Sequence, residues 1–319
     1  MRETRVTEKL GIQYPIVVGT MMNISNPVFV AAASEAGCLG VLPSAMYKST
    51  EDLRNAVQHV HSLTHRPFAV NLSLFPARVP VDYDSYLKLL IDEGVRIIET
   101  SGFGIPDQLV PIFRKADVTW IHKCVGLRYA RKAASLGADM VTVVGHENGG
   151  ATGILDIGTF VLIPTVARSL KIPVIGGGGV TNGRGLAAAL ALGAEAVIMG
   201  TAFLVSEECP IHINLKKALL EAKETDTTLI LRSIGNTHRV WKNEKATEIM
   251  KLEMNQAPLE KLIQAASGEN ALEMYQSGDI SMGTISCGQG IGMLNEIKPL
   301  KKIVEDLISE AELVIRGLQ

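Results

Sequence analysis

The sequence predicts an α/β protein, a (β/α)₈ barrel of the TIM type with a C-terminal helical cap. Glycine is frequent, with 30 of 319 residues, whereas aromatic residues make up only 5%; this composition favours many tight turns over a β-sandwich. Short apolar runs typical of buried parallel strands alternate with amphipathic segments. About eight such units fit into the first 205 residues, which is the repeat number of the barrel.

The expected strands are continuously apolar rather than alternating, as is typical of strands covered on both faces. Turn residues bound each of them. The predicted strands are Tyr14–Val18, Cys38–Leu42, Pro67–Asn71, Arg96–Thr100, Thr119–His122, Met140–Val144, Pro173–Ile175 and Ala196–Met199.

Amphipathic helices are expected between these strands, and many are followed by a glycine that suits a left-handed helix end. Ser49 precedes one helix as a capping hydroxyl. The predicted helices are Pro27–Ala36, Glu51–His61, Tyr83–Asp92, Leu127–Leu136, Thr159–Leu170 and Gly185–Leu192, and the terminating glycines are Gly37, Gly94, Gly137 and Gly193.

A doubly wound open sheet is the alternative fold. Such a sheet usually carries a GxGxxG turn after its first strand. Val18–Met22 does not have that pattern, so the sequence favours the barrel.

The chain changes character after the last expected strand. Residues 207–286 are more charged and helical in pattern, and we expect them to form a cap or lid over one barrel end. Residues 1–206 form the expected barrel, and residues 287–319, with a helix at about Lys298–Gly317, complete it.

Charge and composition exclude several classes of function. The formal net charge is −2, whereas a surface for nucleic acid needs a basic excess. No apolar run reaches the roughly 18 residues of a membrane span. The cysteines form no CxxC pair, and no acidic or histidine cluster predicts a metal site. A cytoplasmic protein with reduced thiols is expected, and the sequence leaves a homodimer open.

Glycines after the seventh and eighth expected strands are the strongest chemical signal. Gly176–Gly179 and Gly200-Thr201 would meet at the carboxyl end of the barrel, where backbone N–H groups can surround a phosphate. The alternative is that the glycines only form a flexible turn. Lys123 and Asn71 also lie at expected strand ends, where they would place a cation and an amide near the same mouth. The alternative is that Lys123 is an ordinary strand-end lysine and Asn71 an ordinary turn former.

Several segments together resemble the nitronate monooxygenase family, formerly called 2-nitropropane dioxygenase, which includes flavin-dependent enoyl-ACP reductases and NADH:quinone reductases. The resemblance covers nearly the whole chain. It is carried by Tyr14-Pro15-Ile16, Pro67–Leu72, Ile121–Cys124, Gly149-Gly150, Ile175–Gly179, Asn182–Gly185, Ala194–Phe203, Tyr275–Asp279 and Gly288–Gly290.

The resemblance implies an FMN-binding barrel, with NADH or NADPH left open as a co-substrate and a small organic molecule as substrate. The phosphate would lie on Gly177, Gly178, Gly179, Gly200 and Thr201, and the ring and ribityl chain along Met21, Met22, Asn71, Lys123 and Gly150. Tyr275 and Gln289 would belong to the lid beside the substrate.

One position departs from the family pattern Gly-Gly-His-x-Gly. Ala151 stands where the resemblance implies a histidine, and His146 is the nearest candidate to replace its proton chemistry. His212 and His238 of the cap are weaker candidates to face the flavin. The sequence therefore predicts a nitronate monooxygenase-like FMN oxidoreductase. The alternatives are an NAD(P)H-dependent reductase of a quinone, enone or enoyl thioester, and a non-redox isomerase or lyase of a phosphorylated metabolite.

Overall fold

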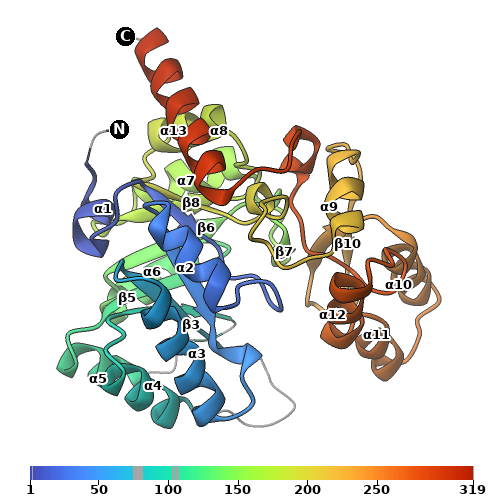
Figure 1. Ribbon diagram of the computed structural model, residues 1–319, viewed down its shortest axis with the longest axis horizontal. Helices are drawn as coiled ribbons and strands as arrows, with labels where there is room; N and C mark the ends of the chain where they lie inside the picture. Colours follow the sequence, from blue (N-terminus) through green and yellow to red (C-terminus); the bar gives the residue numbers. More distant parts are fainter. Residues whose placement is uncertain (2, 75–81, 103, 105–107, 319) are drawn as a thin grey trace.

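Eight parallel strands close into a barrel in the computed structural model, which describes residues 1, 3–74, 82–102, 104 and 108–318 (Figure 1). Each strand pairs with the next, and the last pairs with the first through Val17 and Ile198. The predicted barrel is confirmed. Its strands are β1 (Ile16–Val18), β2 (Leu39–Pro43), β3 (Phe68–Ser73), β4 (Ile97–Ser101), β5 (Thr119–Cys124), β6 (Met140–Val144), β8 (Val174–Gly177) and β9 (Ala196–Met199).

Helices alternate with these strands and cover the outside of the barrel. The four glycines expected to end helices have φ values of +86°, +83°, +96° and +101° in chain order. Ser49 accepts a hydrogen bond from the Asp52 N–H and caps its helix as predicted. The helices are α2 (Pro27–Glu35), α3 (Thr50–Leu63), α4 (Tyr83–Asp92), α5 (Leu109–Lys115), α6 (Leu127–Leu136), α7 (Thr159–Ala167) and α8 (Gly183–Ala191).

A short N-terminal helix, α1 (Arg5–Leu10), lies at the end of the barrel opposite the cap (Figure 1). Val6 and Leu10 join the apolar cluster that fills the barrel interior. Helix α1 is not predictable from the sequence, because six residues are too few for a clear helical period.

The cap contains a β-hairpin in addition to the expected helices. Strand β10 (Thr227–Ile230) pairs with β11 (His238–Trp241), and β11 pairs in turn with the two-residue β7 (Gly150–Ala151) from the loop after β6. The cap helices are α9 (Ile213–Leu220), α10 (Glu244–Met254), α11 (Leu259–Ala265) and α12 (Gly268–Ser277).

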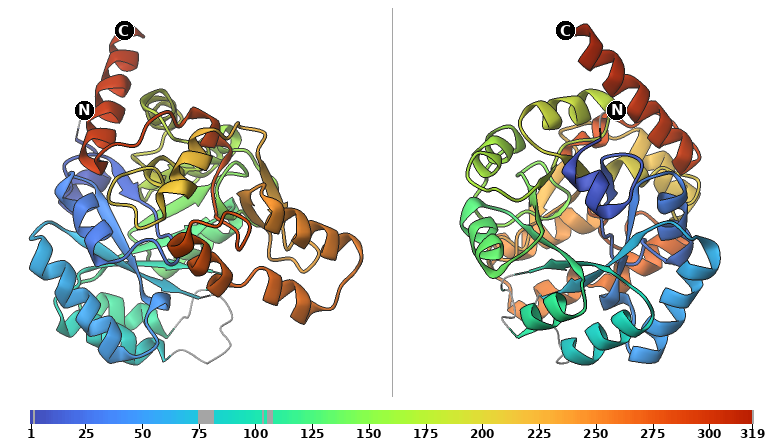
Figure 2. Two further views of the ribbon diagram at one scale, coloured as in Figure 1. Left: turned by 45° about the vertical axis from the view of Figure 1, so that its right-hand side comes forward. Right: turned by 90° about the vertical axis from the view of Figure 1, so that its left-hand side faces the viewer.

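The last helix, α13 (Leu300–Gly317), returns to the barrel and packs against α8 and α2. Its C-terminal turns project beyond the barrel in both views of Figure 2. Two 3₁₀ turns, η2 (Thr201–Phe203) and η3 (Gln289–Met293), follow β9 and precede α13. No helix in the described part of the chain is long and apolar enough to cross a bilayer.

Candidate active site

Polar side chains gather inside the barrel at the carboxyl ends of β3, β4 and β5. Asn71 is the register partner of Glu99, and Ser101 is the partner of Lys123. Paired residues project from the same face of a sheet, and the buried Ile97 and Ile121 on these strands belong to the interior cluster. These strands therefore direct an amide, a carboxylate and an ammonium group toward the barrel mouth.

Glu99 is the centre of a buried hydrogen-bond network that the sequence analysis missed. Its Oε1 accepts from Asn71 Nδ2 at 2.7 Å and from Thr20 Oγ1 at 2.9 Å, and the residue is 1% exposed. A buried carboxylate needs such donors because an unpaired one is costly. A lone acidic residue within the apolar run of β4 was the only sequence signal for it.

Lys123 lies at the end of β5, next to this network. It is partly exposed, and no carboxylate of the described chain lies within ion-pair distance of its Nζ. An ammonium group without a protein counter-ion at a barrel mouth suits an anionic or electron-rich ligand.

Two methionines follow β1 at the same mouth. A Cβ built on Gly200 would lie 3.4 Å from Met21 Sδ, so the Met21 side chain borders the loop after β9. Met22 is 49% exposed. These side chains offer an apolar, polarizable surface against which a flat ring can rest.

Glycine is required at the end of β8 and in the loop after it for two different structural reasons. A Cβ on Gly177 would lie 2.4 Å from Ile198 Cγ2, so Gly177 is required by packing within the barrel. Gly178 and Gly179 have φ values of +98° and +73°, a left-handed backbone that favours glycine.

Four backbone N–H groups at the ends of β8 and β9 are available to a ligand. None of the hydrogen bonds between described residues uses the N–H of Gly178, Gly179, Gly200 or Thr201 as its donor. Backbone N–H groups without a protein acceptor at neighbouring strand ends can bind an anion. This pair of strand ends is also where barrels of this type commonly bind phosphate.

The loop after β6 is fixed to its surroundings by Glu147. This carboxylate accepts from the N–H and the hydroxyl of Thr159, both at 2.9 Å, at the start of α7. The Glu147 carbonyl accepts from Gln289 N–H at 3.0 Å, and Thr201 Oγ1 accepts from Gly288 N–H at 2.9 Å. The segment 287–290 therefore crosses beside the glycine loops, which places Gln289 near the predicted phosphate position.

His146 has contacts at both ring nitrogens. Arg239 Nη2 lies 2.9 Å from His146 Nε2, whereas Nδ1 lies 3.2 Å from Asp156 Oδ1, within ion-pair distance but without a hydrogen bond among the described residues. A guanidinium group only donates, so Nε2 is the acceptor and its lone pair is engaged. Proton transfer by His146 stays a prediction, and these contacts favour a bridging role between the loop and the cap.

Tyr275 and the four cysteines are buried. Tyr275 is 6% exposed and belongs to the main apolar core, where burial raises the pKa of its phenol. All four cysteines are free and buried. Cys124 is 7% exposed and belongs to the main apolar core, and burial raises its pKa to about 12, so this thiol is a small core residue.

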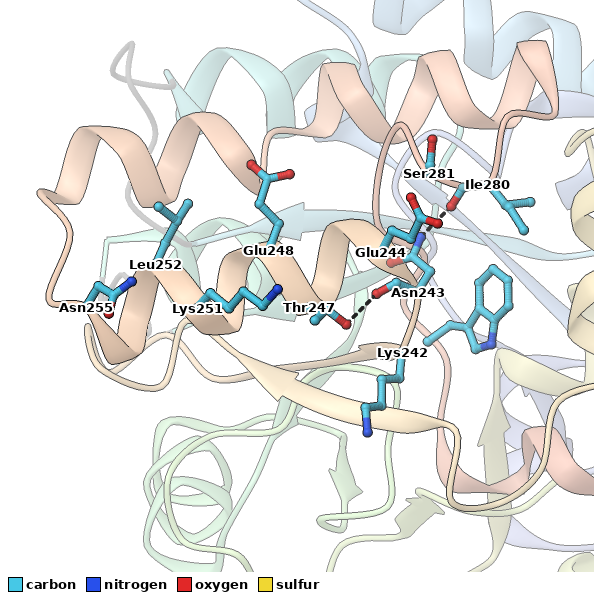
Figure 3. A pocket seen from close by; sticks show the side chains of 11 residues that line it. Lys242, Asn243, Glu244, Thr247, Glu248, Lys251, Leu252, Asn255, Ile280 and Ser281 are labelled. Carbon is cyan, nitrogen blue, oxygen red and sulfur yellow. Dashed lines mark hydrogen bonds between the residues drawn. The ribbon is translucent and has the colours of Figure 1, made fainter.

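The cap carries a separate cavity of about 660 Å³ along α10, lined also by residues 241–243 before this helix and by Ile280 and Ser281 (Figure 3). Asn243 closes its base by donating from Nδ2 to the Ile280 carbonyl at 2.7 Å. Lys242 and Lys251 share the lining with Glu244 and Glu248, and this mixed charge does not select an anionic ligand. A crevice of about 300 Å³ borders Gly178 and Gly179 outside the barrel.

Two solved structures are similar to this chain over nearly its whole length. FabK from Thermotoga maritima is 35% identical with a TM-score of 0.89, and the match covers 100% of this chain and 99% of FabK. The nitroalkane oxidase from Streptomyces ansochromogenes is 26% identical with a TM-score of 0.84, covering 98% and 99% of the two chains.

The relatives with named activities are oxidoreductases. A (3aS,4S,5R,7aS)-5-hydroxy-7a-methyl-1-oxo-octahydro-1H-indene-4-carboxyl-CoA dehydrogenase of Rhodococcus jostii is 32% identical over 97% of this chain and 95% of its own. A probable nitronate monooxygenase of Staphylococcus saprophyticus is 33% identical over 76% of this chain and 79% of its own. The family described as nitronate monooxygenase matches residues 3–310. The chain belongs to this family.

Proposed function

We propose that this protein is an FMN-dependent oxidoreductase that acts on a small organic substrate at the barrel mouth. The observation that carries the proposal is the set of backbone N–H groups at Gly178, Gly179, Gly200 and Thr201 that have no acceptor among the described residues. They fit a dianionic phosphate, because each would make a charge-assisted hydrogen bond to it.

The other mouth residues fit the remainder of FMN. Met21 and Met22 would border the ring, while Asn71, Lys123 and Gly150 would offer polar contacts along it. Asn71 Nδ2 already donates to Glu99 and Ser101. Its Oδ1 accepts from Ser101 Oγ at 3.5 Å, a long hydrogen bond, and would be the contact that it offers. When bound, FMN would supply the electron chemistry, and the chain would bind it, orient it and exclude water.

An acyl thioester is the substrate class that we favour. The support is the similarity over nearly the whole length to a dehydrogenase of a carboxyl-CoA compound. Nitronate oxidation is the second candidate, because of the family itself. Since Ala151 lacks a titratable side chain, a reaction with NADH or NADPH as electron donor is also consistent with the site.

Binding of FMN and of riboflavin to the purified protein tests the cofactor. We expect FMN to bind on the order of 100-fold more tightly or better, because riboflavin lacks the phosphate that these N–H groups would hold. Equal affinities would contradict the phosphate site. A protein that binds neither would favour a phosphorylated metabolite as ligand instead.

Lys123→Gln gives a second test of the same site. We expect it to weaken FMN binding by about tenfold, since one charge contact is removed. The matched control is Lys132→Gln on the exposed face of α6, which we expect to leave FMN affinity unchanged. A panel of NADH, NADPH, acyl-CoA and nitronate with the FMN-loaded protein would then assign the reaction.

A further inference from the structure

The short strand β7 runs across the barrel mouth. At one end, a Cβ built on Gly149 would lie 2.6 Å from the backbone carbon of Cys287, beside the Gly288 N–H that binds Thr201 Oγ1. At the other end, a Cβ on Gly153 would lie 2.7 Å from Val125 Cγ2, just after β5. The residues of β7 therefore lie between the end of β9 and the end of β5.

Strand β11 of the cap brings His238 directly opposite Ala151. The antiparallel register pairs His238 with Ala151 and Arg239 with Gly150. Directly paired residues project from the same face, with Cβ atoms about 5 Å apart. Ala151 presents only a methyl group on the face that it shares with His238.

The two faces of this small sheet have different neighbours. Arg239 projects to the face where it binds His146 Nε2 and the His146 carbonyl oxygen. Successive side chains of a strand alternate in direction, so His238 projects from the opposite face, together with Ala151.

The hydrogen bonding of His238 fixes its tautomer. Nδ1 lies 2.8 Å from the Asn236 carbonyl oxygen, which only accepts, so Nδ1 carries the proton and Nε2 keeps its lone pair. No hydrogen bond between described residues uses Nε2. Burial lowers the pKa of His238, which keeps the ring neutral near pH 7.

No charged group of the described neighbours faces this ring. Ala151 on β7 and Ile230 on β10 flank it and do not titrate. Arg239 points to the other face, and Glu253 of α10 accepts from the N–H groups of Leu231 and Ser233 beyond the strand end.

We infer that His238 Nε2 is the proton-transfer group of this site, supplied by the cap across the strand from Ala151. In the oxidative direction, Nε2 would accept one proton from the substrate, and bound FMN would supply the acceptor for the second hydrogen and its electron pair. In the reductive direction, Nε2 would return the proton to the substrate, and reduced FMN would supply the hydrogen with its electron pair. The inference rests on the proposed function, because it requires that the mouth hold FMN and substrate.

His238→Asn is the most direct test. The Asn amide can still donate to the Asn236 carbonyl oxygen, whereas Nε2 is removed. With FMN-loaded protein and the substrate found in the panel above, we expect turnover to fall 100-fold or more and FMN affinity to stay within threefold. His59→Asn, on the exposed side of α3, is the control and should keep wild-type turnover.

A readout independent of turnover is the absorption spectrum of bound oxidised FMN as a function of pH. We expect a spectral titration below pH 7 in the wild type and in His59→Asn, and its loss in His238→Asn. The double variant Ala151→His/His238→Asn should recover part of both signals, because it places an imidazole on the neighbouring strand.

Each other outcome overturns the inference. His238→Asn with wild-type turnover and an unchanged titration would exclude His238, and loss of both signals in His146→Asn alone would assign the role to His146. If His238→Asn does not fold, absence of the spectral titration in the wild-type protein overturns the inference by itself. A wild type that binds no FMN refutes the proposed function, which the binding assay detects separately.

Discussion

Two adjacent residues of β5 show how a strand separates neighbouring polar groups. Lys123 points into the barrel mouth, whereas His122 points outward into the layer between the strands and the helices. There Trp120 Nε1 donates to Thr100 Oγ1 at 2.8 Å, and the Thr100 hydroxyl shares a hydrogen bond of 2.9 Å with His122 Nδ1. His122 is therefore a structural residue, although the sequence places it beside a cofactor candidate.

Burial lowers the pKa of His122 to about 4, which predicts a pH dependence of stability. The folded state holds the neutral ring, while the unfolded chain takes up a proton near pH 6.5. The free energy of unfolding should therefore be fully retained above pH 6.5 and fall by roughly 3 kcal/mol between pH 6.5 and pH 4. Urea unfolding at several pH values measures this slope.

His122→Asn should have a lower free energy of unfolding than the wild type, but this free energy should no longer show the fall between pH 6.5 and pH 4 that His122 causes. His59→Asn, at an exposed histidine, is the control and should keep it. Parallel pH profiles for wild type and His122→Asn would contradict this account.

At the level of elements, the sequence predicted the barrel within a few residues. The strands could be found because buried parallel strands are continuously apolar, and Met140–Val144 and Ala196–Met199 begin and end as expected. The hairpin β10–β11 was missed because its eight paired residues have a mixed burial pattern and lie among helical segments.

The candidate site was predictable only in part for the same reason. Gly178 and Gly179 form a visible run in the sequence, as does the Gly200-Thr201 pair. Glu99 is one carboxylate in an apolar strand. His238 lies opposite Ala151 only because β11 pairs with β7, and the two residues are 87 positions apart in the sequence (238 − 151). Local patterns carry no information about such a pairing.

Two glycines of α8 make a matched pair for a test of helix packing. A Cβ on Gly183 would lie 2.5 Å from the Leu307 carbonyl oxygen and 2.6 Å from the Ala311 nitrogen, both in the backbone of α13. The nearest atoms to a Cβ on Gly185 are 3.4 Å away, an ordinary contact.

Gly183→Ala should therefore lower the free energy of unfolding by about 2 kcal/mol or more, because α13 must move away from α8. Gly185→Ala should stay within about 1 kcal/mol of wild type, since Ala favours the helix and meets no clash. Thermal and urea unfolding compare the two variants. Equal losses of unfolding free energy would contradict this prediction, because they would show that the backbone of α13 does not restrict the side chain at position 183.

At the level of the whole molecule, the cap is fastened to the barrel at several separate points. Asn23 Nδ2 after β1 donates to the Gly268 carbonyl at 3.0 Å. On the other side, Arg239 binds His146, and Arg232 pairs with Asp156. Strand β7 adds main-chain pairing to β11.

Arg239→Ala should loosen this second side. Arg239 is 4% exposed and donates to three acceptors, two on His146 and one on Thr227. We therefore expect the variant to lose about 2 kcal/mol of unfolding free energy. Hydrogen exchange should increase in β10 and β11 and remain unchanged in β1–β5. Arg54→Ala, in a surface ion pair on α3, is the control. Equal hydrogen-exchange protection of β10 and β11 in the two variants would contradict the prediction.

Because β7 belongs by sequence to the barrel and by pairing to the hairpin, the two parts are not interchangeable modules. A chimera that transplants only residues 207–286 from a relative would join a foreign β11 to the resident Gly150-Ala151. Recombination within this family should therefore keep the loop at 146–153 together with the hairpin from the same parent.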